Sequence, residues 1–199
     1  MYLWDGPEDS AHLVVLAPGD QGRLEDSAPT AIAEGLAAAG LRVVRFPFPP
    51  CGDADSAARD ALLAGLIREA AALQAPHQRL VLGGLSRGAR VSGDLVAELA
   101  ATCLLGFAYP FHPRQDPDPG DRPEALGRLP VPALICQGTR DSHGNQQQVR
   151  GYKLPDHIQV HWLEDANHAL HPRARSGHTQ AGQLAEASAL AAAFVCALP

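Results

Sequence analysis

A serine between two glycines is the part of this sequence best suited to covalent chemistry. Residues 84–88 read Gly-Leu-Ser-Arg-Gly and match the pattern G-x-S-x-G, between the apolar run RLVLGGL and a segment of helical period. A turn that raises a serine hydroxyl above a sheet needs small residues on both sides, and Gly84 and Gly88 meet that need. Serine also favours helix N-caps, so an ordinary cap is the alternative. The motif predicts that Ser86 is a nucleophile.

A base and an acid are expected further along the chain, because a serine hydroxyl becomes a good nucleophile only when a correctly held base takes its proton. On a parallel α/β sheet these residues follow strands at their carboxyl ends, in the order Ser, Asp or Glu, His. Asp141 comes just after the apolar run ALICQG, and His168 follows the run IQVHWL. These positions predict that Asp141 is the acid and His168 the base.

Other carboxylates and imidazoles compete for these two roles. Asp165 is too near His168 in the sequence to be the acid that orients it, and two rival histidines, His171 and His178, lie closer to the last predicted helix. Three further carboxylates belong to a loop rich in proline: Asp116, Asp118 and Asp121. Asp141 is preferred because it alone among these carboxylates directly follows a strand of buried type.

Backbone N–H groups near Ser86 are expected to stabilise negative charge on a substrate oxygen. The first turn of a helix leaves its N–H groups unpaired, so the N–H of Arg87 can face this oxyanion. The loop of residues 18–22 (PGDQG) follows the first predicted strand and should lie beside Ser86. Its proline has no N–H to offer. The candidates for the second donor are therefore the N–H groups of Gly19, Asp20 and Gln21.

Two arginines, Arg87 and Arg90, stand near the start of the helix that follows Ser86. Positive charge at a helix N-terminus opposes the helix dipole and costs about 0.3–1 kcal/mol for each residue. Departures from such local rules are often functional. Our hypothesis is that Asp20 pairs with Arg90, or with Arg87 or Arg23, and so offsets this unfavourable charge.

Three side chains are candidates for substrate binding. The guanidinium of Arg87 would favour an anionic acyl or leaving group if it projected over the pocket, although a solvent-facing side chain is the alternative. His112 in YPFHPR and His143 in RDSHG stand in polar loops that follow predicted strands. Both are expected over the site, with ordinary loop residues as the alternative.

The elements that position these residues alternate between strands and helices along the chain. Helices are expected from Ser27 to Gly40 and over residues 56–74, 86–100, 122–129 and 176–198. Strands are expected over residues 12–19, 41–48, 79–85, 102–110, 131–141 and 158–165. This alternation predicts an α/β fold whose sheet is mainly parallel, with helices on both faces and the strand over 79–85 at its centre.

The composition excludes several classes of function. With 199 residues, the chain is expected to form a single domain, residues 1–199. The formal net charge is −6 and no dense basic run is present, which argues against nucleic-acid binding. The four cysteines lack metal-ligand spacing, and no apolar run reaches the roughly 18 residues of a membrane span. We expect a cytoplasmic protein without metal or cofactor, either a monomer or a homodimer.

The segments LGGLSRGARVS, QGTRD and EDANHALHPRARSGHTQ resemble the α/β-hydrolase family, and the resemblance extends from about residue 12 to residue 197. They look most like a small branch that contains dienelactone-hydrolase-like proteins and relatives of the NSL-complex hydrolase-like subunit. This resemblance implies a compact three-layer sandwich with little or no lid, and Ser86, Asp141 and His168 as nucleophile, acid and base. The family often has a His-Gly loop after its first strand, whereas this chain has PGDQG.

The function that the resemblance implies is serine hydrolysis of small ester-type substrates through an acyl-enzyme, as in carboxylesterases. Two alternatives remain open at this point. The same residues would serve a thioesterase or an acyltransferase, and some relatives keep the hydrolase fold for protein interaction without catalysis. The altered loop at residues 18–22 favours the interaction protein, whereas the complete set of serine, acid and base favours the enzyme.

Overall fold

The computed structural model describes residues 1–20, 22–23, 26–114, 120 and 122–199. Within these residues the strands are β1 (Leu3–Asp5), β2 (His12–Ala17), β3 (Arg42–Arg45), β4 (Arg79–Leu85), β5 (Cys103–Phe107), β6 (Ala133–Gly138) and β7 (Ile158–Leu163). The helices are α1 (Ser27–Ala38), α2 (Ser56–Ala71), α3 (Arg87–Leu95), α4 (Arg122–Gly127), α5 (Gln146–Val149) and α6 (Gln180–Ala197).

The strands form one sheet in the order β1-β3-β2-β4-β5-β6-β7. β1 pairs antiparallel with β3, and every other neighbouring pair is parallel. β4 lies between β2 and β5, which confirms the predicted central place of the strand over 79–85. Because parallel strands end at the same edge of a sheet, the loops after β2, β4, β6 and β7 gather there.

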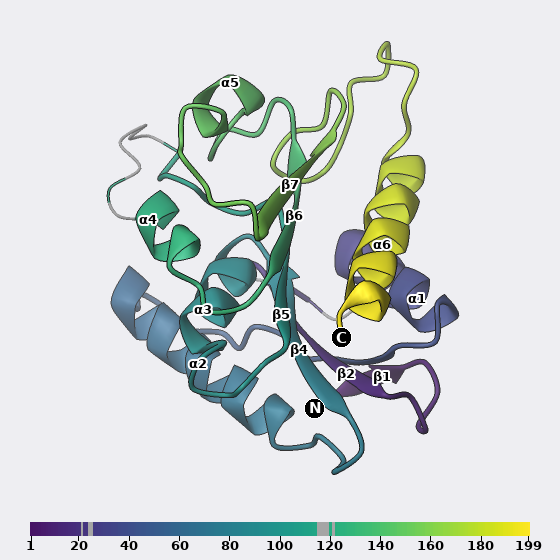
Figure 1. Ribbon diagram of the computed structural model, residues 1–199. Helices are drawn as coiled ribbons and strands as arrows, with labels where there is room; N and C mark the ends of the chain where they lie inside the picture. The colour runs from purple at the N-terminus through teal and green to yellow at the C-terminus, as the bar shows by residue number, and fades with distance from the viewer. Residues whose placement is uncertain (21, 24–25, 115–119, 121) are drawn as a thin grey trace.

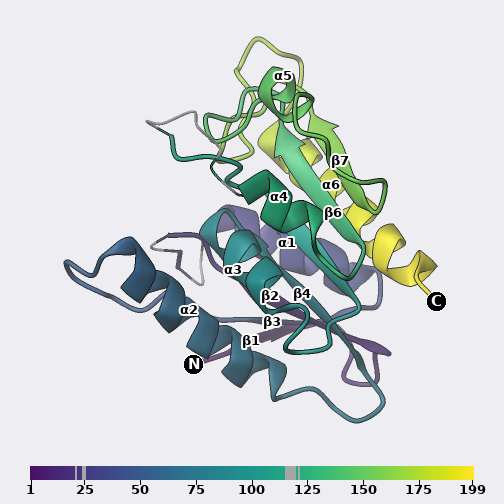
Figure 2. The same ribbon diagram turned by 60° about the vertical axis from the view of Figure 1, so that its left-hand side comes forward.

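Helices cover both faces of this sheet, as the sequence predicts. Figures 1 and 2 show α2 and α3 on one face and α1 and α6 on the other. Side chains along β2 alternate between the two layers: Val15 and Ala17 belong to the core with α2 and α3, and Val14 and Leu16 to the core with α1 and α6. Such strands are apolar at consecutive positions because both of their faces are buried.

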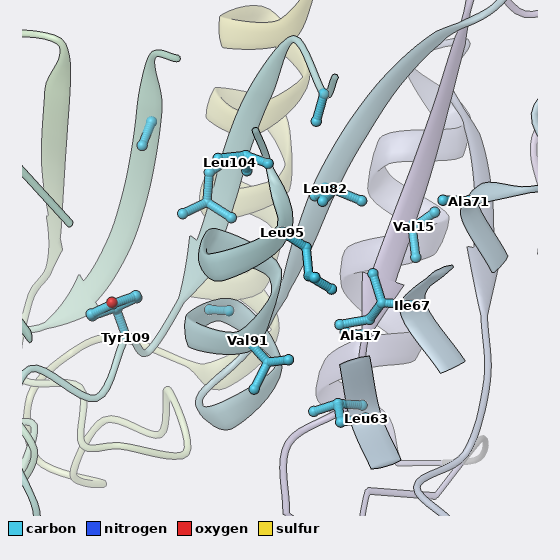
Figure 3. Packing of buried hydrophobic residues seen from close by; sticks show 14 of the residues in the cluster. Val15, Ala17, Leu63, Ile67, Ala71, Leu82, Val91, Leu95, Leu104 and Tyr109 are labelled. Carbon is cyan, nitrogen blue, oxygen red and sulfur yellow. The ribbon is translucent and has the colours of Figure 1, made fainter. Parts of the chain in front are cut away.

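The core under α2 and α3 supports the carboxyl end of β4, where the turn that carries Ser86 begins. In Figure 3, side chains of α2, α3 and the neighbouring strands pack against one another; those labelled include Val15, Leu63, Ile67, Leu82, Val91 and Leu95. Each of these side chains is at most 4% exposed. Dense packing of this kind fixes α3 on the sheet and therefore fixes the start of that helix.

Two short elements, β1 and α5, are present in the structure but are not predicted from the sequence. β1 has three residues, and its Leu3 and Trp4 side chains are exposed, so no buried apolar run indicates it. α5 has four residues of polar composition and is held by a capping box between Asn145 and Gln148. Neither gives the periodic signal on which prediction from sequence depends.

The last helix begins later than predicted. α6 starts at Gln180, where the Thr179 hydroxyl accepts a hydrogen bond of 3.1 Å from the Gly182 N–H, whereas the expected start was residue 176. Gly177 has a φ of +81°, which a right-handed helix does not accommodate. The terminal helix is therefore shorter at its N-terminus than its composition suggests.

Little chain is present to cover the carboxyl edge of the sheet. Between β5 and β6 the described residues form the single short helix α4, which agrees with the expectation of a weak helix near residue 122. None of the helices in the described part of the chain combines the length and apolar character that a bilayer crossing requires.

Candidate active site

Ser86 sits in a strained turn between β4 and α3. Its φ is +50° and its ψ is −117°, in a region that non-glycine residues rarely adopt. The Ser86 N–H donates a 2.9 Å hydrogen bond to the Phe107 carbonyl, which ties the turn to β5. Ser86 occupies the N-cap position of α3, yet its hydroxyl makes no capping hydrogen bond. The hydroxyl instead points to an imidazole, which distinguishes it from an ordinary helix cap.

The flanking glycines let the start of α3 approach the end of β2. A Cβ added at Gly84 would lie 2.6 Å from the carbonyl carbon of Gly88 and 2.8 Å from the oxygen of Ala17. A Cβ at Gly88 would lie 2.5 Å from the oxygens of both Ala17 and Pro18. These neighbours are backbone atoms, which cannot move aside cheaply. The motif glycines are therefore required by close packing of the loop after β2 against the helix start.

This packing gives a stability prediction. Gly88→Ala is expected to lower the free energy of unfolding by about 1–3 kcal/mol because the methyl group overlaps two carbonyl oxygens. Gly65→Ala is the matched control, since Gly65 lies in helix α2 and nothing is within 4 Å of its added Cβ. That change should leave stability equal or raise it by up to about 1 kcal/mol. Urea unfolding measures both, and equal midpoints for the two variants would contradict the packing argument.

Three side chains from three loops form a continuous hydrogen-bonded chain. The Ser86 Oγ lies 2.8 Å from His168 Nε2, and His168 Nδ1 lies 2.9 Å from both carboxylate oxygens of Asp141. Because a carboxylate only accepts hydrogen bonds, the Nδ1 of a neutral His168 carries the proton and its Nε2 accepts from the Ser86 hydroxyl. Asp141 is 1% exposed, and the His143 N–H donates a further 2.7 Å hydrogen bond to it. The arrangement suits removal of the serine proton.

The rival acid near His168 has another role. Asp165 accepts hydrogen bonds from the Arg173 side chain and N–H, and Arg140 lies 3.4 Å from the same carboxylate. The hydrogen bond from the Arg173 side chain is the main reason that the pKa of Asp165 falls to about 2. Asp165 thus holds the chain around residues 165–173. The rival carboxylates at 116, 118 and 121 lie outside the described residues.

The rival histidines are not part of the serine cluster. His171 Nδ1 contacts the Pro172 carbonyl at 3.3 Å, and His178 is exposed before α6. The structure therefore brings together the three residues that strand order selected and leaves these competitors apart.

His143 covers one side of His168. The two ring centroids are 4.2 Å apart at an interplanar angle of 43°. His143 Nδ1 donates a 3.0 Å hydrogen bond to the His112 carbonyl, which fixes the ring. Burial, and then the neighbouring His168, lower the pKa of His143, so its imidazole is neutral at pH 7. His143 presents an uncharged ring beside the base.

A cavity of about 560 Å³ opens over Ser86. The loop after β2, the start of α1, and the loops after β5, β6 and β7 contribute its walls. Those walls combine apolar surface with two carboxylates, and within the described residues neither lysine nor arginine lines them. The lining residues that bear on the chemistry are Gly19, Asp20, Asp26, Ser86, His143 and His168.

Two of the three substrate-binding candidates lie away from this cavity. The His112 side chain is 2% exposed, donates from Nδ1 to the Pro113 carbonyl at 2.8 Å, and does not line the cavity. The Arg87 guanidinium does not line it either, because Asp20 and Asp60 hold it. His143 alone of the three faces the cavity. A role for Arg87 in binding an anionic substrate group is therefore not supported.

The loop after β2 reaches the expected place beside Ser86. A Cβ added at Gly19 would lie 3.7 Å from the Ser86 Cβ and 3.5 Å from the Leu85 oxygen. Gly19 and Asp20 line the cavity, and Arg87, the residue after Ser86, begins helix α3. Their N–H groups are thus candidate donors to an oxyanion. Gln21, the remaining candidate, lies outside the described residues.

Among the described residues, no group of three or more His, Cys, Asp or Glu side chains is arranged to hold a metal ion. The polar groups around Ser86 are engaged with one another, as the Asp141–His168 and Arg87–Asp20 pairs show.

Comparison with solved structures identifies proteins of the same architecture. The chain matches an alpha-beta serine hydrolase homologue from Coxiella burnetii with a TM-score of 0.72 and 20% identity, over 98% of this chain and 90% of that one. It matches a serine hydrolase without lid from Xanthomonas campestris with a TM-score of 0.72 and 24% identity, over 100% and 89%. Est1E from Butyrivibrio proteoclasticus gives a TM-score of 0.74 at 13% identity, over 98% and 94%.

These neighbours establish the fold as that of the α/β hydrolases in a form without a lid, as the sequence predicts. The narrower resemblance to dienelactone-hydrolase-like proteins and to relatives of the NSL subunit stays a prediction. The family model described as "Alpha/beta hydrolase domain" matches residues 10–196, which is nearly the whole chain. The chain therefore belongs to the alpha/beta hydrolase family.

Proposed function

We propose that this protein is a serine hydrolase that cleaves small ester-type substrates through an acyl-enzyme, as carboxylesterases do. The observation that supports the proposal most directly is the hydrogen-bonded chain from Ser86 through His168 to Asp141, at the floor of an accessible cavity. An esterase domain from Rhodothermus marinus is among the structural neighbours.

The first half-reaction forms a bond between Ser86 and the acyl group. His168 Nε2 takes the hydroxyl proton while the Ser86 Oγ attacks the ester carbonyl carbon, and the C=O electron pair moves onto oxygen. The N–H of Arg87, with that of Gly19 or Asp20, donates to this oxyanion. The intermediate then collapses, the C–O bond to the alcohol breaks, and His168 returns the proton to the leaving oxygen. The product is an acyl ester of Ser86 and a free alcohol.

The second half-reaction regenerates the serine. His168 removes a proton from water, the resulting hydroxide oxygen attacks the acyl carbon, and the proton is passed to the Ser86 Oγ as the carboxylic acid leaves. Asp141 stabilises the imidazolium in both steps because its buried carboxylate accepts from Nδ1. The mechanism uses only the groups of this chain and water.

The site is expected to prefer neutral substrates over anionic ones. Asp20 and Asp26 line the cavity, whereas no lysine or arginine of the described residues does, and the Arg87 guanidinium is held by Asp20 and Asp60. For isosteric esters with the same leaving group, kcat/KM should be about threefold to tenfold lower for the anionic ester, and the difference should narrow at high salt. Asp26→Asn should also reduce this difference in kcat/KM, because it removes one negative charge from the cavity wall. Faster turnover of the anionic ester would contradict this expected preference.

A substrate panel tests the proposed function. Hydrolysis of short-chain p-nitrophenyl esters, a thioester and a lactone should be measured with wild-type protein and with Ser86→Ala. The proposal predicts turnover of at least the short esters by wild type and a loss on the order of 10⁶-fold in the variant. Turnover that is equal in both proteins, or absent in wild type toward every substrate, would contradict it and favour the non-catalytic interaction protein. Transfer of the acyl group to an added alcohol in preference to water, with little free acid formed, would instead identify an acyltransferase.

A further inference from the structure

The Arg87 side chain joins three segments of the chain beside Ser86. Its Nε donates to one oxygen of Asp20 at 2.6 Å, and a terminal nitrogen donates to the other oxygen at 3.1 Å. The second terminal nitrogen donates to Asp60 at 2.5 Å and to the Ser56 hydroxyl at 3.0 Å. Asp20 belongs to the loop after β2, whereas Ser56 and Asp60 belong to α2. One guanidinium at the start of α3 thus holds both.

Arg90 supports this arrangement from the next turn of α3. Its guanidinium donates to the second carboxylate oxygen of Asp60 at 2.5 Å, so Asp60 lies between two arginines. Burial alone would raise the pKa of Asp60, but hydrogen bonds from Arg90 and Arg87 lower it overall, so the carboxylate is charged at pH 7. Asp20 and Asp60 thereby compensate the two cations that oppose the α3 dipole.

The same residues carry the expected oxyanion donors. Arg87 directly follows Ser86 and begins α3, and Gly19 of the loop after β2 lies so near Ser86 that a Cβ added at Gly19 would be 3.7 Å from the Ser86 Cβ. The ion pair therefore joins the two halves of the oxyanion site through their own side chains. An oxyanion donor acts only within about 2.7–3.1 Å of the oxygen. A small shift of the loop would take its N–H groups out of range.

Because the Arg87 guanidinium binds both carboxylate oxygens of Asp20, this pair can fix the distance between the start of α3 and the loop after β2. A guanidinium that binds both oxygens of a carboxylate fixes the direction as well as the separation of its partner, which a lysine cannot do. The Arg87 side chain is 16% exposed and that of Asp20 is 47% exposed, so solvent screens the pair and its contribution to stability is small. The Arg87–Asp20 pair is therefore expected to affect the position of the loop after β2 more than the stability of the protein.

We propose that the Arg87–Asp20 ion pair, supported by Asp60, is a positioning device that holds the loop after β2 where its N–H groups share the substrate oxyanion with the N–H of Arg87. The inference rests on the proposed function. Arg87 and Asp20 act through their side chains as positioning residues, separately from the backbone donors that touch the substrate.

A double-mutant cycle on turnover tests this device. Arg87→Met and Asp20→Asn should each lower kcat about tenfold to a hundredfold, less than the full loss of a donor, while KM changes by less than about twofold. Because both changes release the same loop, the double variant should be no slower than the slower single variant. Arg87→Lys should behave like Arg87→Met, since one ammonium cannot bind Asp20 at two points and Asp60 as well.

A matched ion pair away from the site provides the control. Arg68 on α2 makes a similar two-point contact with Glu98, at 2.6 and 2.8 Å, and both side chains are about half exposed. Arg68→Met and Glu98→Gln should leave kcat unchanged. A boronic acid that forms a tetrahedral adduct with Ser86 provides a second readout: its affinity should fall in parallel with kcat in the Asp20 and Arg87 variants, which a loss of general stability would not produce.

Two results would overturn the device and leave the proposed function intact. One is kcat within twofold of wild type in folded Arg87→Met and Asp20→Asn. The other is a double variant whose loss equals the product of the two single losses, which shows that the residues act independently. Failure of the proposed function looks different, because the wild-type protein itself would then neither hydrolyse an ester nor bind the boronic acid, and the positioning role would fall with it.

Discussion

Replacing Ser86 with alanine is expected to lower kcat/KM for a short-chain ester by on the order of 10⁶-fold. The Ser86 Oγ is the atom that His168 Nε2 contacts at 2.8 Å, and without it no covalent acyl intermediate forms. The variant keeps a smaller rate acceleration, because it still binds the ester and its oxyanion donors still assist direct attack by water. The change removes one oxygen from a side chain that lines an open cavity, so the fold should persist.

The measurement is steady-state hydrolysis of a p-nitrophenyl ester, with thermal unfolding of each protein as the test of folding. Ser142→Ala is a suitable control, because Ser142 is exposed and adjoins Asp141 in the sequence. It should retain wild-type turnover. If folded Ser86→Ala kept more than a few per cent of wild-type activity, Ser86 would not be the nucleophile.

The second large effect is expected from Asp141→Asn, which should reduce kcat on the order of 10⁴-fold with little change in shape. The carboxylate accepts from His168 Nδ1 with both oxygens, so it keeps the proton of the neutral ring on Nδ1 and leaves Nε2 free to take a proton from Ser86. An asparagine amide can present N–H groups to Nδ1 and so favour the opposite tautomer, which has no acceptor facing the serine.

Asp165→Asn distinguishes Asp141 from another carboxylate considered as the acid for His168. Asp165 is bound to Arg173 and Arg140, so its replacement should lower stability modestly and reduce kcat by less than about tenfold. Steady-state kinetics of the two variants give the answer. A large loss for Asp165→Asn with near-normal turnover for Asp141→Asn would mean that the acid has been assigned to the wrong residue.

The strand and helix order could be predicted because buried parallel strands leave a strong signal. β2, β4, β5 and β6 are continuous apolar runs that end at Gly, Pro or polar residues, and helices of ordinary length separate most of them. β1 and α5 gave no comparable signal, since one is an exposed strand of three residues and the other a polar turn of helix. Short elements depend on their tertiary neighbours more than on their own sequence.

Ser86, Asp141 and His168 could be predicted from the topology of the sheet. A parallel sheet brings the ends of β4, β6 and β7 to one edge, and one suitable residue follows each of these strands. The partners of the Arg87 side chain could not be predicted in this way. Asp20 was among its expected partners, but Asp60 was not, because which face of α2 meets α3 is decided by core packing through residues such as Leu63 and Ile67. Side-chain direction at a helix start depends on that packing.

His112 illustrates a related limit. Its place in a polar loop after β5 suggested a substrate contact, yet the ring is buried and its backbone carbonyl is the group that matters, as the acceptor for His143. A polar residue in a loop near a site can support the site from behind. Sequence alone does not distinguish these orientations, because both place the residue in the same loop.

Covalent labelling tests the nucleophilic role of Ser86 most directly. Folded protein should be treated with a fluorophosphonate, digested, and examined by mass spectrometry, in wild type and in His168→Ala. We expect one adduct per chain, on Ser86, which forms at least a hundredfold more slowly in His168→Ala because the hydroxyl then lacks its base. No adduct on folded wild-type protein, an adduct on another residue, or a labelling rate indifferent to His168→Ala would contradict it.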